Sequence, residues 1–95
     1  MWYLYVVKCS DNSLYCGITK NVQARVLVHN KGTGAKYTRS RRPVVLDDFC
    51  KVTSSKSDAL KIEYAFKQLS RKKKLETLDF GLAAFSKAYL REQSG

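Results

Sequence analysis

The sequence predicts an α+β fold in which a small three-stranded antiparallel sheet is flanked by helices in the order ββαβαα. Three observations lead to this class. Two aromatic and β-branched runs flank a polar turn near the N-terminus, apolar residues recur at helical spacing further on, and another β-branched run follows the single proline. With 95 residues, the chain has room for one compact core. We therefore expect a single domain over residues 1–95.

The first two elements form a predicted hairpin. The run WYLYVVK, residues 2–8, has the composition of a strand, and the polar stretch SDNS separates it from a second short run, LYCGI. Turn residues between two such runs indicate antiparallel strands joined by a tight connection.

The pattern then becomes helical between about residues 20 and 31. The residues that recur at this spacing are Val22, Val26 and His29. Thr19 or Asn21 is a suitable N-terminal cap. A basic loop with two glycines follows, and the run PVVLDDFCKV suits a third strand that starts just past Pro43.

A second helix is expected over residues 58–70, with Ser57 as its cap. Its predicted apolar face consists of Ala59, Ile62, Phe66 and Leu69. Helical residues continue over 75–90, weakened by Gly81. We expect a domain core over about residues 2–75 and a C-terminal helical extension over about 76–92.

The charge balance favours a polyanionic partner. Eighteen Lys and Arg against eight Asp and Glu give a formal charge of +10. The first basic cluster lies in the glycine-containing loop and consists of Lys36, Tyr37, Arg39, Arg41 and Arg42. The second consists of Arg71, Lys72, Lys73 and Lys74. We expect phosphate contacts from both clusters. The alternatives are a generic basic surface for the first and, for the second, a solvated helix end that complements the helix dipole.

Several classes of site and location are disfavoured. No apolar run approaches the roughly 18 to 20 residues of a membrane span, and no secretory leader is recognisable, so we expect a location in the cytoplasm or wherever DNA resides. Cys9, Cys16 and Cys50 are odd in number and form no CxxC pair, which indicates reduced packing thiols. The segment KGTGAKYT lacks P-loop spacing, so no nucleoside triphosphate site is expected.

Five residue types stand in an order that resembles the GIY-YIG nuclease domain, especially its short stand-alone members. The two family motifs correspond to YLY, ending at Tyr5, and YCG, starting at Tyr15 and closed by Gly17. An arginine and a histidine of the following helix match Arg25 and His29, and the family's metal-binding glutamate matches Glu63 in LKIEYAFKQL.

The resemblance implies a role for each matching residue. Tyr5 is the implied general base, Tyr15 orients the water or phosphate, and Arg25 suits a phosphate oxygen. His29 would hold Tyr5 or relay its proton. Glu63 would bind a single Mg²⁺, for which Mn²⁺ is a possible substitute, because Mg²⁺ commonly takes one or two protein carboxylates and keeps several waters.

Taken one at a time, each of these residues also has a structural interpretation. The tyrosines suit sheet packing, the arginine suits a solvated helix face, and the histidine suits a hydrogen-bonded position near the helix end. Glu63 would pair with Lys67 one turn later. Gly17 could mark a strand irregularity or a close approach of substrate.

The expected function is a Mg²⁺-dependent endonuclease that cuts DNA and leaves a 5′ phosphate and a 3′ hydroxyl. Selectivity for nicked, flapped, branched or single-stranded DNA in repair or recombination is expected, because no additional reader domain is present. A protein partner could supply targeting. The alternatives are a nucleic-acid-binding module with a vestigial site, an RNA-directed nuclease, and an unrelated interaction protein that is basic for solubility.

Overall fold

A computed structural model describes residues 1–94 of the chain. Its elements, in chain order, are β1 (Trp2–Lys8), β2 (Leu14–Thr19), α1 (Val22–Lys31), α2 (Lys36–Arg39), β3 (Val45–Thr53), α3 (Lys56–Lys67), α4 (Arg71–Phe80) and α5 (Leu82–Ser94). The three strands form one antiparallel sheet in the order β2-β1-β3. The predicted α+β class and the predicted sheet are confirmed.

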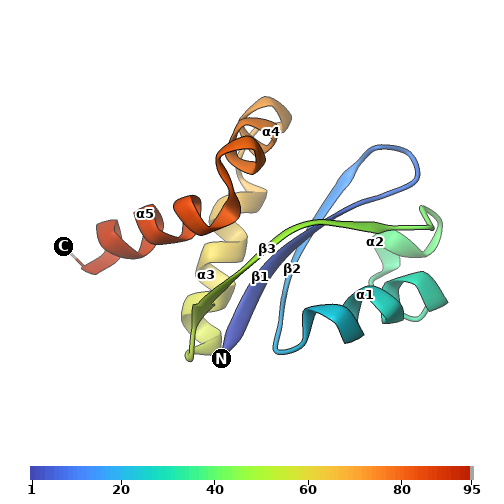
Figure 1. Ribbon diagram of the computed structural model, residues 1–95, viewed down its shortest axis with the longest axis horizontal. Coiled ribbons are helices and arrows are strands. Elements are labelled where there is room, and N and C mark those ends of the chain that lie inside the picture. The colour runs from blue at the N-terminus through green and yellow to red at the C-terminus, as the bar shows by residue number, and fades with distance from the viewer. Residues whose placement is uncertain (95) are drawn as a thin grey trace.

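Helices cover both faces of this sheet, with α1 and α2 on one side and α3, α4 and α5 on the other (Figure 1). The central strand β1 is therefore shielded on two faces. This explains its continuous buried run, Leu4 to Val7, where a sheet with one wet face would show alternation.

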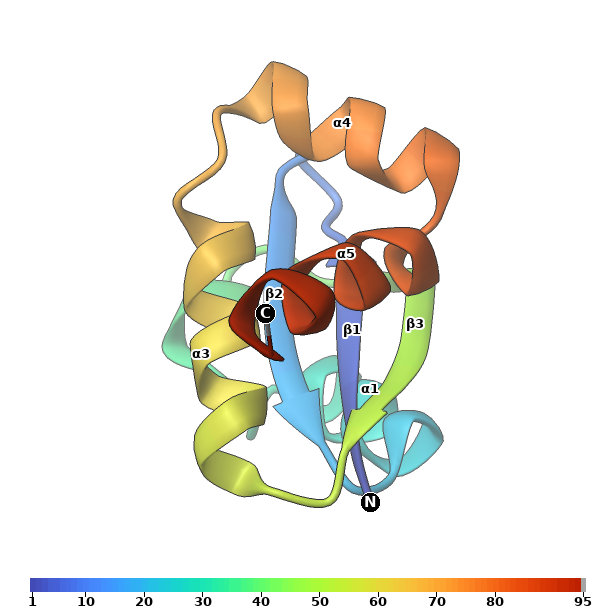
Figure 2. The same cartoon turned by 90° about the vertical axis from the view of Figure 1, so that its left-hand side faces the viewer.

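The larger apolar core lies between the sheet and the C-terminal helices. Figure 2 shows α5 in front of the strands and α1 behind them. The fully buried members of this larger core include Leu4, Ile62, Phe66 and Leu82. Complete burial of such a side chain typically stabilises a fold by about 1.5–3 kcal/mol. A second cluster around Tyr5 and Val22 fills the α1 side.

The predicted cap of the second helix was wrong. Ser55, and not Ser57, caps α3, since its hydroxyl accepts a hydrogen bond from the Asp58 amide at 3.3 Å. This choice places the Asp58 carboxylate in the first turn, where the helix dipole favours a negative charge. The helix also ends at Lys67, short of the predicted residue 70, because Ser70 caps the next helix through the Lys73 amide.

The predicted helix over 75–90 is two helices. Gly81 separates α4 from α5 with a φ of 101°, in the region that favours glycine. The next amide, that of Leu82, donates to Asp48 Oδ2 at 2.8 Å, and the Leu82 side chain enters the core. A further short helix, α2, occupies part of the predicted basic loop.

The three cysteines are buried free thiols, as predicted. Within residues 1–94, no helix combines the length and the apolar character that crossing a membrane requires.

Candidate active site

Tyr5 lies at the centre of the sheet, on the face covered by α1. Its partner across β1 and β2 is Gly17, and the tyrosine ring lies over this glycine. A Cβ atom on residue 17 would lie 2.6 Å from the Tyr5 hydroxyl oxygen and 2.8 Å from Cζ. Gly17 therefore provides the space for a buried tyrosine, which accounts for the glycine that closes the second motif.

Replacing Gly17 with alanine is expected to destabilise the protein by roughly 1–3 kcal/mol, because the new methyl group overlaps a ring that has no free space to enter. The free energy of unfolding in urea measures this change. An unfolding midpoint equal to that of the wild type would contradict the close contact between Gly17 and Tyr5.

A chain of buried hydrogen bonds starts at the Tyr5 hydroxyl. It lies 2.8 Å from His29 Nε2, and His29 Nδ1 lies 2.9 Å from Thr38 Oγ1. The Thr38 hydroxyl donates to the Ala35 carbonyl at 2.9 Å. Because that hydroxyl has one hydrogen, it must accept from a protonated Nδ1 of His29. Nε2 of the neutral imidazole is then an acceptor, so the Tyr5 hydroxyl donates to it.

The pKa shifts of the two residues agree with this direction of the hydrogen bonds. Burial raises the pKa of Tyr5 to about 12, although the nearby Arg25 guanidinium lowers it. Burial also lowers the pKa of His29, and the charge of Arg25 lowers it further. At neutral pH the pair is therefore a phenol that holds its proton and a neutral imidazole whose Nε2 lone pair accepts the phenol's hydrogen bond. The geometry provides His29 Nε2 as an acceptor for the Tyr5 proton, while both pKa shifts keep that proton on Tyr5 until nearby cations lower the tyrosine's pKa.

The chain has a single histidine, so its imidazole signal in a proton NMR titration belongs to His29 without ambiguity. We expect a pKa below the ordinary value of 6.5. The unfolded chain then binds more protons than the folded protein below about pH 6.5, so this residue makes stability fall as the pH drops through that range. A pKa at or above 6.5 would contradict a neutral, buried His29.

Arg25 lies one turn before His29 on α1 and is half-buried. Its charge acts on both Tyr5 and His29, which places the guanidinium beside their hydrogen bond. A planar, permanently charged group in this position is suited to a phosphate oxygen.

Tyr15 connects this centre to the basic loop. Its ring meets the edge of His29 at a centroid distance of 5.3 Å and stacks on Tyr37 at 5.9 Å. Arg41 lies 4.0 Å above the Tyr37 ring. The predicted site residues Tyr5, Tyr15 and His29 are thus in one contiguous group, and Tyr37 from the first basic cluster extends it.

Glu63 approaches the group from α3, which packs along β2. Its Oε1 lies 3.5 Å from Lys67 Nζ, which in turn lies 5.5 Å from the centre of the Tyr15 ring. The i,i+4 pairing that offers a structural interpretation of Glu63 is therefore present. In this arrangement the Lys67 side chain lies between the Glu63 carboxylate and the Tyr15 ring.

An open hollow of about 300 Å³ lies between β2, α3 and α4 on this side. Its lining consists of Leu14, Tyr15, Cys16, Tyr37, Phe66, Lys67 and Lys74. Among the described residues no group of three or more His, Cys, Asp or Glu side chains is arranged to hold a metal. The partly exposed Glu63 carboxylate fits a cation such as Mg²⁺, which is satisfied by one protein carboxylate and several waters.

The first basic cluster divides into two groups. Arg41 bonds to the Asp11 carboxylate at 3.1 Å and Arg42 donates to the Arg39 carbonyl at 2.9 Å, so both arginines stabilise the loop. Lys36 and Arg39 have exposed side chains.

The second cluster occupies the first turn of α4, so the alternative interpretation, a helix end that complements the dipole, was wrong. Ser70 caps the helix immediately before Arg71, which places the four cations at its positive end. Arg71 donates to the Asn12 carbonyl at 3.0 Å, while Lys72 and Lys73 are exposed. Stability gains nothing from cations at this end of a helix, whereas an anionic ligand would be attracted to it.

Sequence reasoning did not find Thr38 or Gly34. Thr38 fixes the His29 tautomer, and a Cβ on residue 34 would lie 2.6 Å from His29 Nδ1. The only available signal was a second glycine in the loop, because no spacing rule connects residues 34 and 38 to a helix that ends at Lys31.

The fold and the order of these residues define a nuclease domain. The model of the GIY-YIG catalytic domain matches residues 1–76, so the chain belongs to the GIY-YIG family. Membership implies nuclease activity and a nucleic acid as substrate.

Relatives with the same short format share much of the sequence. A UPF0213 protein of Staphylococcus haemolyticus is 54% identical over 77 residues, which cover 81% of this chain and 93% of the relative. A solution NMR structure of a UPF0213 protein from Bacillus halodurans is 41% identical and superposes with a TM-score of 0.54, covering 84% of this chain and 85% of that chain. A second solution NMR structure, of a protein from E. faecalis, is also 41% identical and superposes with a TM-score of 0.52. The match covers 82% of this chain and 83% of that chain.

Proposed function

We propose that the chain is a divalent-metal-dependent endonuclease that hydrolyses phosphodiester bonds of DNA. The observation that carries this proposal is the hydrogen-bonded chain from Tyr5 through His29 to Thr38, with Arg25 beside it. A tyrosine with a pKa of about 12 is a poor base by itself. A neutral imidazole at 2.8 Å supplies an acceptor for the phenol's proton, while the charge of Arg25 and of a bound metal would lower the pKa of Tyr5 towards the range in which that transfer occurs.

Each residue then has a task. Tyr5 takes a proton from the attacking water while its own proton passes to His29 Nε2. The Thr38 hydroxyl accepts from Nδ1–H and keeps the imidazole in the receptive tautomer. Arg25 holds a phosphate oxygen, and Tyr15 orients the phosphate or the water through its hydroxyl. The products are a 5′ phosphate and a 3′ hydroxyl.

Glu63 would hold one Mg²⁺, or Mn²⁺ in its place. When bound, the metal supplies neutralisation of charge on the phosphate and on the departing 3′ oxygen. Lys67 pairs with the carboxylate at 3.5 Å and would have to release it. Ion pairs at i,i+4 on a helix contribute only about 0.2–0.5 kcal/mol, so the exchange would cost little free energy.

The basic residues favour recognition of DNA shape. Exposed cations of α2 and of the first turn of α4, including Lys36, Arg39, Lys72 and Lys73, lie on elements that flank the hollow around Tyr15. Phosphate contacts carry no base information, so we propose structure-selective cutting of branched, nicked or single-stranded DNA in repair or recombination. A protein partner would supply further targeting.

Cleavage of a labelled panel tests this proposal. The panel contains single-stranded, nicked, flapped, branched and intact duplex DNA together with the corresponding RNA, in Mg²⁺. We expect a cut in DNA that contains unpaired or discontinuous strands, and slower cutting of intact duplex. Binding of the panel without a cut in any member would overturn the nuclease proposal, and exclusive cutting of RNA would overturn the assignment to DNA.

A further inference from the structure

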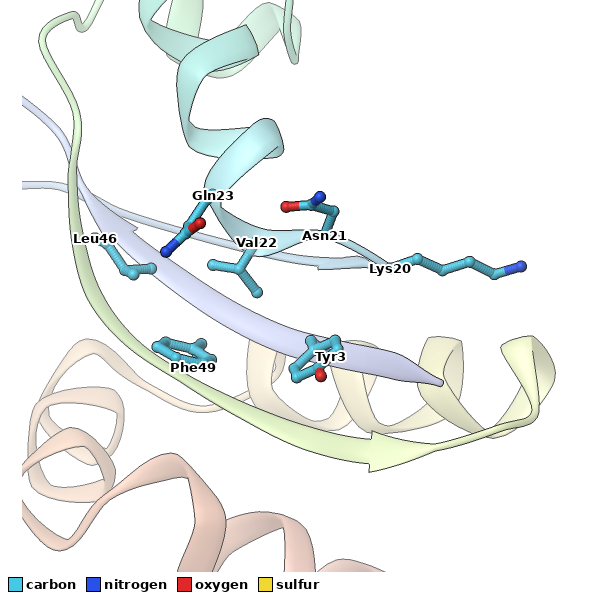
Figure 3. Close-up of a pocket in the computed structure, with 7 residues that line it drawn as sticks. All are labelled: Tyr3, Lys20, Asn21, Val22, Gln23, Leu46 and Phe49. Carbon is cyan, nitrogen blue, oxygen red and sulfur yellow. The ribbon is translucent and has the colours of Figure 1, made fainter.

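A second hollow, of about 310 Å³, lies on the α1 face of the sheet and is not used by the chemistry above (Figure 3). It is lined by Tyr3, Lys20, Asn21, Val22, Gln23, Leu46 and Phe49. Figure 3 shows the Tyr3 and Phe49 rings side by side on the strands, below the first turn of α1. The volume is at the lower end of the range of about 300–1,000 Å³ for small-ligand sites.

This hollow adjoins the candidate active site. Phe49 on β3 is the direct cross-strand partner of Tyr5 on β1. Tyr3 precedes Tyr5 by two positions and therefore lies on the same face of the sheet. On the opposite wall, Val22 precedes Arg25 by three positions along α1, a spacing at which two residues share a helix face. A nucleotide neighbouring a phosphate held by Arg25 would therefore meet this hollow.

The lining has the chemistry of a base-binding site. The rings of Tyr3 and Phe49 are 6.4 Å apart at 52° to one another, and Phe49 is 49% exposed. The Gln23 amide has no hydrogen-bond partner among residues 1–94, whereas the Asn21 side-chain oxygen is already engaged by the Ala24 amide at 3.0 Å. A half-exposed phenylalanine ring with an adjacent side-chain amide that has no partner suits a flat heterocycle with polar edges.

The lining contains one cation, Lys20, and no acidic residue. Lys20 points away from the rings in Figure 3, and its ammonium lies 5.2 Å from the centre of the Trp2 ring. A net charge of +10 adds attraction for a phosphate-linked ligand. These charges favour a base that belongs to a nucleic acid strand over a free neutral heterocycle.

We propose that the hollow formed by Tyr3, Phe49 and Gln23 binds the unpaired base of a nucleotide next to the cleaved phosphodiester bond. The inference rests on the proposed nuclease function, and it specifies the substrate as a strand with a base outside a duplex stack. A base in intact duplex has both faces covered by its neighbours and cannot enter. The hollow thereby gives a physical reason for selectivity towards single-stranded or frayed DNA.

Binding in EDTA tests the site without any need for cleavage. The probes are a short single-stranded oligonucleotide and a fully abasic oligonucleotide of the same length. The wild type should prefer the normal strand, and F49A should reduce that preference by about 5- to 100-fold, the range that loss of one base–aromatic stack gives. F49Y keeps an aromatic face and should restore the preference.

The matched control is F80A, which removes another phenylalanine ring, 86% exposed, from the end of α4. It should bind both probes as the wild type does. An equal preference in F49A and wild type, or an equal loss in F49A and F80A, would overturn the base site. Circular dichroism of F49A excludes unfolding as the cause. If F49A does not fold, F49L, which keeps an apolar side chain but no aromatic face, should show the same loss of preference.

Cleavage of the normal strand in Mg²⁺ separates the two proposals. If the wild type cuts but its preference for bases does not depend on Phe49, the nuclease survives and the base site fails. If base-dependent binding depends on Phe49 but no cut occurs, the base site survives and the nuclease fails. A single abasic position should suppress the cut only at the neighbouring bond, and suppression at distant bonds would contradict the proposed location.

Discussion

Replacing Glu63 with glutamine is expected to reduce the cleavage rate by about 1,000-fold or more while binding of DNA is retained or strengthened. The carboxylate is the proposed metal ligand, and metal stabilisation of the transition state typically contributes several kcal/mol. The substitution removes one negative charge next to a polyanion, so binding should not weaken. Single-turnover cleavage and fluorescence anisotropy measure the two quantities separately.

The chain offers a close control for this substitution. Glu76 pairs with Lys73 at 3.5 Å, the same distance as in the Glu63–Lys67 pair, but lies on α4. Glu76→Gln should cut at a rate near that of the wild type. Each of the two variants loses one ion pair, and each loss should lower the free energy of unfolding by less than about 1 kcal/mol. Equal rates for the two variants would remove Glu63 from the chemistry.

Replacing Tyr5 with phenylalanine is expected to lower the cleavage rate by roughly 100- to 10,000-fold, the usual contribution of a positioned acid or base. The buried Nε2 of His29 also loses its donor, which should cost about 1–3 kcal/mol of stability. Tyr64→Phe is the control, because Tyr64 is exposed on α3.

A pH profile distinguishes proton transfer from a structural role for Tyr5. The wild-type rate should fall below about pH 6.5 as His29 becomes protonated and can no longer accept from Tyr5, with the midpoint lowered by burial. The residual activity of the phenylalanine variant should lack this acidic limb. An identical limb in both proteins would assign Tyr5 to packing alone.

The elements that the sequence predicted correctly are those with a strong local pattern. The hairpin follows from two aromatic and β-branched runs around a polar turn. α1 and the apolar face of α3 follow from the helical spacing of residues such as Ile62 and Phe66, both of which are buried. The short α2 has no such period. The position of α2 is fixed instead by a contact with another element, the hydrogen bond from His29 on α1 to Thr38.

The same distinction applies to the candidate site. Residue order identified Tyr5, Arg25 and His29, which the fold brings together on one face of the sheet. The direction of their hydrogen bonds depends on Thr38, which loop packing alone places beside the imidazole. The position of the second basic cluster on its helix likewise depends on the helix caps. Ser55 caps α3 and Ser70 caps α4, and the sequence alone did not distinguish these serines from their neighbours.

The measurement that tests the nuclease most directly is the single-turnover cleavage rate of a labelled single strand by the wild type as Mg²⁺ is titrated. A single cation bound by Glu63 predicts a hyperbolic rise to saturation, no cutting in EDTA, and recovery of activity with Mn²⁺. Cleavage that persists in EDTA, or a rate that Mg²⁺ raises equally in the Glu63→Gln variant, would contradict a metal-dependent nuclease at this site.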